Sequence, residues 1–95
     1  MADPGPGRRR AHVLISGRVQ NVFFRATLAD VAREIGVDGW VTNRRDGRVE
    51  AVFEGEPRQI EAALTWSKTG PPGARVDALE VTDEPPLGER GFFIR

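Results

Sequence analysis

A short loop near the start of the chain carries the residues best suited to bind an anion. The run Gly17-Arg18-Val19-Gln20-Asn21-Val22 connects a predicted strand to a predicted helix. In such a loop, successive backbone N–H groups turn toward one point beside the positive end of the helix dipole. A phosphate group suits that point because several donors converge on its oxygens. The pattern therefore favours a phosphate site, although a plain strand-to-helix turn also fits it.

Arg25 falls in the first turn of the helix that follows this loop. A cation is unfavourable there because it lies next to the positive end of the helix dipole. The position makes sense if a doubly charged anion lies between the guanidinium and the loop amides, since the planar guanidinium can bind two phosphate oxygens at once. A surface arginine without a ligand is the alternative on pattern alone.

Asn43 ends a predicted strand, just before a predicted hairpin turn. An asparagine beside a turn usually hydrogen-bonds to the local backbone. Its amide both donates and accepts, however, so it could instead orient a water molecule beside a bound phosphate. Periodicity alone leaves both interpretations open.

The inventory of side chains excludes several kinds of chemistry. The chain has no cysteine, which excludes disulfides, thiolate nucleophiles and cysteine-rich zinc sites. Its one histidine, His12, makes a histidine metal centre or a Ser-His-Asp relay untenable, and we expect it to be a strand residue with one partner. We expect both tryptophans to pack on the core or the sheet. A solvated acidic face, rather than a catalytic carboxylate pair, is expected for Glu54, Glu56 and Glu61.

Hydrophobic periodicity predicts the elements that must position these residues. Residues 24–35 have an apolar stripe at helical spacing that Gly36 ends. Asp46-Gly47 between two strand-like runs is a strong hairpin signal, and Pro57 suits the first turn of a second helix. In the run 76–82, the alternation of inward-facing and outward-facing residues is interrupted at Ala78-Leu79, which indicates a β-bulge. Strands are predicted at residues 12–16, 37–43, 48–54, 76–82 and 92–95.

The order of elements predicts a fold class. It is β-α-β-β-α-β with a terminal strand added, and right-handed crossovers place both helices on one face of the sheet. We therefore predict an α+β protein of the ferredoxin-like, split β-α-β type, with an antiparallel sheet and a short C-terminal strand. A chain of 95 residues forms one domain, which we place at residues 11–95. Residues 1–10, with three consecutive arginines, are expected to be a disordered tail.

Net charge and hydropathy limit the kinds of partner that this protein can have. The net charge is zero, with +4 in residues 1–48 and −4 in residues 49–95. A neutral total disfavours a general nucleic-acid binder, and residues 49–53 lack the aromatic motif of an RNA-binding strand. The positive charge of the first half of the chain is still compatible with a local anion-binding site there. The chain has neither a membrane-spanning apolar run nor a secretory signal pattern, so we expect a cytoplasmic monomer without nucleic-acid or membrane partners.

Two motifs resemble those of a known family, the acylphosphatases. Residues 17–25, Gly-Arg-Val-Gln-Asn-Val-Phe-Phe-Arg, resemble the family's phosphate-binding pattern Gly-x-Val-Gln-Gly-Val-x-Phe-Arg. Residues 39–43, Gly-Trp-Val-Thr-Asn, resemble the second motif, which ends in the catalytic asparagine. The likeness covers roughly residues 11–95. Asn21 departs from the pattern by replacing its second glycine; asparagine tolerates a positive φ better than most residues do.

The resemblance implies an enzyme that hydrolyses an acyl phosphate to a carboxylate and inorganic phosphate, without metal or cofactor. It makes Arg25 and Asn43 catalytic, with Asn43 aligning the attacking water. A non-catalytic module that binds phosphate or a protein through the same fold is the alternative. The resemblance assigns phosphate binding to Gln20, Asn21, Val22, Phe23, Phe24 and Arg25.

Overall fold

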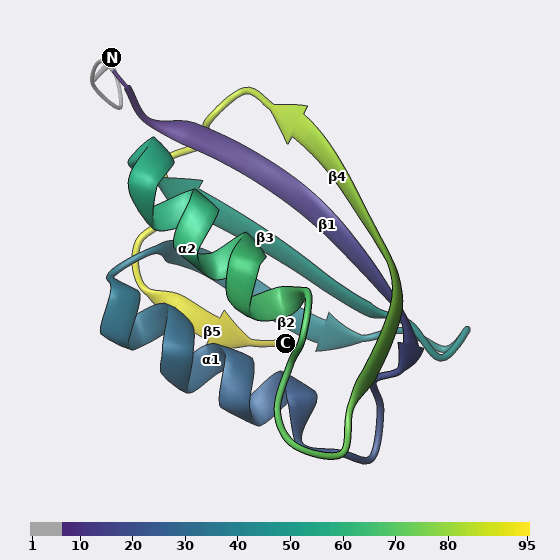
Figure 1. The fold of residues 1–95 in the computed structure, drawn as a ribbon. Helices are drawn as coiled ribbons and strands as arrows, with labels where there is room; N and C mark the ends of the chain where they lie inside the picture. The colour runs from purple at the N-terminus through teal and green to yellow at the C-terminus, as the bar shows by residue number, and fades with distance from the viewer. Residues whose placement is uncertain (1–6) are drawn as a thin grey trace.

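The elements follow the predicted order in the computed structural model, which describes residues 7–95 (Figure 1). Helix α1 occupies its predicted residues, and Gly36 ends it in the left-handed conformation with φ 89°. The bounds are β1 (Arg9–Arg18), α1 (Phe24–Ile35), β2 (Asp38–Asn43), β3 (Val49–Gly55), α2 (Pro57–Ser67), β4 (Arg75–Glu84) and β5 (Phe92–Ile94).

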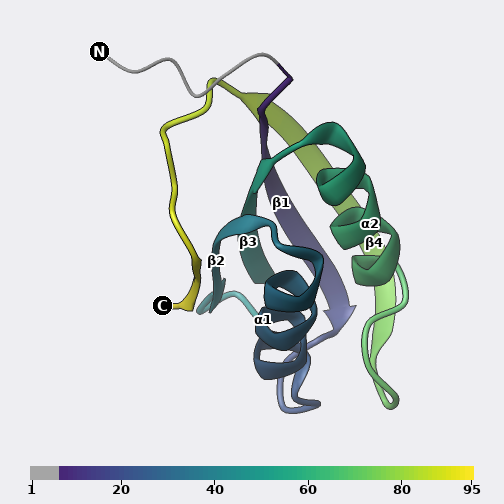
Figure 2. The same ribbon diagram turned by 90° about the vertical axis from the view of Figure 1, so that its left-hand side faces the viewer.

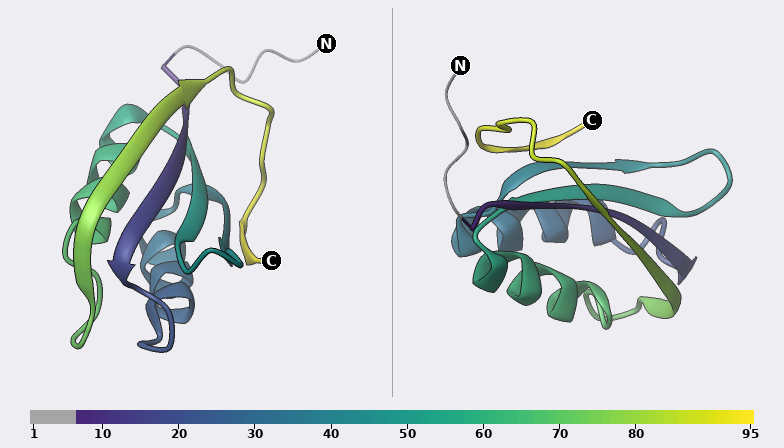
Figure 3. Two further views of the ribbon diagram at one scale, coloured as in Figure 1. Left: turned by 90° about the vertical axis from the view of Figure 1, so that its right-hand side faces the viewer. Right: turned by 90° about the horizontal axis from the view of Figure 1, so that it is seen from above.

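The five strands form one sheet in the order β4-β1-β3-β2-β5. Four of them pair antiparallel, as predicted, with β1 in the interior between β3 and β4. The prediction gave no direction for the added C-terminal strand, and this strand, β5, pairs parallel to β2. The reason is the route of the chain: residues 85–91 cross from the β4 edge to the opposite edge, so β5 meets the free edge of β2 running in the same direction (Figure 3).

Both helices cover one face of the sheet, which confirms the ferredoxin-like arrangement (Figures 2 and 3). The core lies between these two layers because alternate residues of β1 and β3 point toward the helices. The stripe predicted for α2 is buried as expected, at Ile60, Ala63, Leu64 and Ser67. The fully buried strand residues of the core include Ala11, Val13, Ile15, Val49, Ala51 and Phe53.

The predicted N-terminal tail is shorter than expected. Strand β1 begins at Arg9 rather than at residue 12, and Arg8 already forms ion pairs with Asp38 and Glu54, both at 3.1 Å. The prediction of a disordered tail over residues 1–10 is therefore wrong for residues 8–10, and its first six residues lie outside the described chain. The composition of this segment predicted disorder because the carboxylate partners of these arginines lie thirty or more residues away along the chain.

Glu54 is fully buried, contrary to the solvated face expected from the sequence. Its carboxylate accepts hydrogen bonds at 2.8 Å from three successive backbone N–H groups, at residues 87–89. It also pairs with Arg8 and with Arg10, at 3.1 and 3.2 Å. These bonds hold the segment that leads to β5 against the face of the sheet opposite the helices. The alternation of residues along β3 could not predict that this segment buries Glu54.

The hydrogen bonds of Glu54 control its ionisation. Burial by itself raises the pKa of a carboxyl group, but the bonds from the backbone at residues 87 and 89 and from Arg8 and Arg10 outweigh burial and hold the pKa of Glu54 below its ordinary value. A carboxylate with a lowered pKa stabilises the folded state fully above its unfolded pKa, near 4.3. That contribution is lost as the pH falls through the lower, folded-state pKa.

We predict that Glu54→Gln lowers the free energy of unfolding at pH 7 by about 3 kcal/mol, because Arg8, Arg10 and three backbone N–H groups lose the buried carboxylate that they bond. The variant should also lose part of the stability decline that the unmodified protein shows below about pH 4. Urea denaturation at pH 7, 4 and 3 measures both effects. Glu61→Gln is the control, because Glu61 is exposed and, among residues 7–95, pairs only with Arg9, at 3.7 Å. Equal stability of the two variants at pH 7 would contradict the role of Glu54.

Candidate active site

The register of the sheet brings the two motifs together. Val49 of β3 lies opposite Ile15 of β1 on one side and opposite Asn43 of β2 on the other. Asn43 therefore lies two strands away from Ile15, at the end of the sheet where β1 leads into the candidate loop. This arrangement requires both strand pairings, and no local pattern predicts it.

Gly17 lies where β1 meets the bulge of β4. The register between these strands shifts after Ser16, and Asp77 is the extra residue, one position before the predicted bulge at Ala78-Leu79. Gly17 has φ 127°, and a side chain there would collide with the backbone carbonyl of Arg75. Only glycine allows β1 and β4 to approach so closely at the start of the loop.

The loop that follows has an unusual backbone. Asn21 and Phe23 have φ values of 63° and 62°, and they are the two non-glycine residues with positive φ in the described chain. Alternating handedness of this kind turns successive N–H groups toward a common point. Phe23 also precedes α1 without any side-chain cap for the first N–H groups of the helix. The loop and the helix start therefore present backbone donors suited to an anion.

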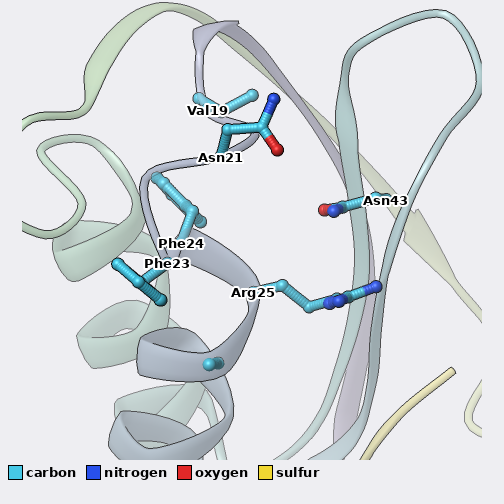
Figure 4. A pocket seen from close by; sticks show the side chains of 7 residues that line it. Val19, Asn21, Phe23, Phe24, Arg25 and Asn43 are labelled. Atoms are coloured by element: carbon cyan, nitrogen blue, oxygen red, sulfur yellow. The ribbon is translucent and has the colours of Figure 1, made fainter.

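A pocket of about 370 Å³ opens beside this loop. Arg25 of α1 and Asn43 of β2 extend into the same space from different elements (Figure 4). Sequence reasoning named both residues. It did not assign the side chains of Val19 or Ala26 to the site, although Val19 belongs to the loop motif. The lining residues are Val19, Asn21, Phe23, Phe24, Arg25, Ala26 and Asn43.

Asn43 has an unsatisfied polar atom. Its Oδ1 is buried and has no hydrogen-bond partner among residues 7–95, although most buried polar atoms in folded proteins have one. The turn that follows is the predicted Asp46-Gly47 hairpin, closed by a 2.8 Å bond from the Arg44 N–H to the Arg48 carbonyl. Asp46 accepts the local hydrogen bonds of this turn, from the backbone N–H of Arg48 at 3.1 Å and from its guanidinium at 2.8 Å, and within the described chain Asn43 Oδ1 takes no part in them.

Phe24 forms the inner wall of the pocket. Its ring is buried and meets Trp66 of α2 edge to face, with ring centroids 5.4 Å apart. The backbone at Gly70 lies so close to the Phe24 ring that a side chain at that position would collide with it. The start of α1 is thus held by packing, and the packing role expected for Trp66 is confirmed.

Gln20 and Val22 do not line the pocket, unlike the other four residues named for phosphate binding. The side chain of Gln20 donates two hydrogen bonds to the β2–β3 hairpin, to the carbonyls of Arg44 at 2.7 Å and Arg48 at 3.0 Å. Val22 packs against the hydrophobic core. The sequence pattern does not tell which side chains of the loop face the pocket.

Other candidates lie away from the pocket. His12 has the single partner expected for it, a 2.6 Å contact between its Nε2 and Glu50 Oε2. The described residues contain no group of three or more histidines and acids arranged to hold a metal ion. Nor does any helix within residues 7–95 have the length and apolarity to span a membrane.

Comparison with known proteins identifies the family. The sequence model of the acylphosphatase family matches residues 11–94. The chain belongs to the acylphosphatase family. The acylphosphatase of Roseiflexus sp. (strain RS-1) is 58% identical over 86 residues, which are 90% of this chain and 92% of that protein. This relationship makes the chain an enzyme, a hydrolase of acyl phosphates, rather than a non-catalytic module.

Solved acylphosphatases have the same fold. The structure from Coxiella burnetii is 35% identical, covers 94% of each chain and superimposes with a TM-score of 0.90. The acylphosphatase from Bacillus subtilis is 34% identical, covers 92% of this chain and 98% of its own, and has a TM-score of 0.88. The ferredoxin-like fold of this acylphosphatase is therefore that of its relatives along almost the whole described chain.

Asn21 replaces the second glycine of the acylphosphatase loop pattern, and its φ of 63° explains why the pattern has glycine there. We predict that Asn21→Val lowers the free energy of unfolding by about 1–2 kcal/mol, because a β-branched residue is strained in this region. Asn21→Gly should change it by less than about 0.5 kcal/mol, because relief of strain is offset by the greater entropy of the unfolded chain. Urea denaturation of both variants decides this, and a valine variant as stable as the glycine variant would disprove the strain.

Proposed function

We propose that this acylphosphatase hydrolyses its substrate by direct attack of one water molecule on a phosphoryl group, without a covalent intermediate. Arg25 and the backbone N–H groups of residues 20–24 hold the phosphoryl group, and Asn43 orients the water. The observation that carries the proposal is the buried, unpartnered Oδ1 of Asn43, which lies in the same pocket as the Arg25 guanidinium.

The phosphoryl group fits the loop for electrostatic reasons. Its oxygens can accept hydrogen bonds from the N–H groups that the positive φ values of Asn21 and Phe23 turn to one side. Arg25 adds a charged, two-pronged donor, and no ion pair within residues 7–95 involves its guanidinium. Fixed donors of this type stabilise the charge that spreads over the three equatorial oxygens in the transition state.

Asn43 acts on the nucleophile. Its Oδ1 accepts a hydrogen bond from the water, so that a lone pair of the water points at phosphorus. Orientation of this kind replaces a general base, because alignment alone removes much of the barrier. Arg25 is the one ionisable residue among those lining the described pocket, which agrees with a mechanism that lacks a carboxylate or imidazole base.

The reaction balances without a general acid. The water oxygen bonds to phosphorus as the bond from phosphorus to the acyl oxygen breaks, and the bonding electrons leave with the carboxylate. Both protons of the water remain with the product phosphate, so an acyl phosphate dianion yields a carboxylate and dihydrogen phosphate. A carboxylate is a stable leaving group that needs no protonation, and the pocket supplies the positioning and charge stabilisation that the transfer requires.

Two variants distinguish the binding of phosphate from the attack of water on phosphorus. Arg25→Ala should lower kcat/KM by at least about 10³-fold and weaken competitive inhibition by inorganic phosphate, because it removes the charged clamp. Asn43→Ala should lower kcat by about 10²–10³-fold while inorganic phosphate still inhibits nearly as well, because it removes only the water-orienting amide. Release of phosphate from benzoyl phosphate measures both.

Arg25→Lys tests whether charge alone suffices. Lysine keeps the charge but lacks the planar guanidinium that binds two oxygens, so activity should recover only in small part. For the Asn43→Ala variant described above, near-normal turnover would refute the role of Asn43 in orienting water.

We also predict that turnover does not require a metal ion. Phosphate release from acetyl phosphate should proceed at the same rate in metal-free buffer, with a chelating agent and after adding Mg²⁺. The physical reason is that Arg25 and the loop amides supply the positive potential that a metal supplies in other phosphoryl-transfer enzymes. Loss of activity with the chelator, and its return with a divalent ion, would contradict the proposed mechanism.

A further inference from the structure

The proposed site is divided between two segments of the chain. All groups that would hold the phosphoryl group lie on residues 17–25, from the end of β1 to the first turn of α1. Asn43, which would hold the water, lies at the end of β2. In-line attack therefore depends on how accurately the loop and the β2–β3 hairpin are held relative to each other.

One side chain joins these two segments directly. The Nε2 group of Gln20 has two hydrogens, and it donates to the carbonyl of Arg44 at 2.7 Å and to that of Arg48 at 3.0 Å. Arg44 follows Asn43 in the chain, and its N–H bonds the Arg48 carbonyl across the hairpin at 2.8 Å. Within the described chain, Gln20 is the only side chain of residues 17–25 that hydrogen-bonds to the hairpin.

We propose that Gln20 is a positioning residue, whose bonds to Arg44 and Arg48 set the water on Asn43 in line with the phosphoryl group held by the loop. This inference rests on the proposed function, but it assigns Gln20 a task apart from phosphate binding. Its side chain does not line the pocket, and both of its donors are occupied by the hairpin. Two short bonds that converge on neighbouring carbonyls restrict sliding as well as separation of the two segments.

The proposal predicts a specific kinetic signature. Loss of the Gln20 bonds allows the loop and the hairpin to shift against each other, whereas the loop amides and Arg25 shift together because they belong to one segment. Phosphate binding is then preserved, and the alignment of water with phosphorus is lost. A displacement of about 1 Å can cost as much as 10²-fold in rate.

The test is Gln20→Met, which keeps the length of the side chain but removes both donors. We expect kcat for benzoyl phosphate to fall about 10–100-fold, while the inhibition constant of inorganic phosphate changes less than about twofold. In the Asn43→Ala background the same substitution should lower kcat by less than about twofold, because no oriented water remains to be misplaced. An equal loss in both backgrounds, or a marked loss of phosphate inhibition, would overturn the proposal.

Gln59→Met is the matched control. Gln59 is the other glutamine of the chain, and it caps α2 through a 2.9 Å bond from the Glu56 N–H to its Oε1. Its replacement removes a comparable hydrogen bond away from the pocket, so it should lower the unfolding midpoint and leave kcat unchanged. A fall in kcat equal to that of Gln20→Met would show that the effect reflects stability alone.

A second variant covers the case in which Gln20→Met does not fold. Gln20→Glu has nearly the same shape, but the ionised carboxylate cannot donate to the two carbonyls. It should show the same loss of kcat with phosphate inhibition retained, and unchanged kcat would overturn the proposal.

If Asn43→Ala itself keeps normal turnover, the proposed function fails. If Asn43→Ala is inactive and Gln20→Met is fully active, only the positioning role fails.

Discussion

The register of β1, β3 and β2 is the constraint on which the active site depends. Val49 lies between Ile15 and Asn43, so the end of β2 lies beside the point at which β1 turns into the loop. A shift of one residue in either pairing would turn the side chain of Asn43 to the other face of the sheet. The buried residues of β1 and β3 prevent such a shift, because it would expose the helix-facing core.

The site itself contains features that oppose stability. Asn21 and Phe23 adopt left-handed conformations, the Phe23 side chain is 82% exposed, and Asn43 Oδ1 has no partner. Such features persist only where the surrounding structure determines them. Here the support comes from the edge-to-face contact of Phe24 with Trp66 and from the two bonds of Gln20. An anion that bonds the loop amides would offset part of the cost.

The arginines of this acylphosphatase have two distinct uses. Arg8 and Arg10 bond the buried Glu54 at the end of the sheet remote from the pocket, and Arg48 bonds Asp46 at the tip of the hairpin. These pairs neutralise charge within the scaffold, which explains how a chain with a net charge of zero still presents a cation to the pocket. Arg25 is that cation, because it lines the pocket without an ion-pair partner in the described chain.

The sequence by itself determined the elements of this protein and named the main residues of the candidate site. Helical spacing and Gly36 defined α1, Asp46-Gly47 defined the hairpin, and two motifs singled out Arg25 and Asn43, because these signals are local. Tertiary structure decided what depends on distant partners. The burial of Glu54, the ion pair of Arg10 with Glu89 and the parallel direction of β5 all follow from the route of residues 85–91 across the sheet. The motif placed Gln20 in the phosphate-binding loop but did not predict the partners of its side chain. The structure directs that side chain to two carbonyls of another segment, since only the folded chain brings those acceptors within 3.0 Å.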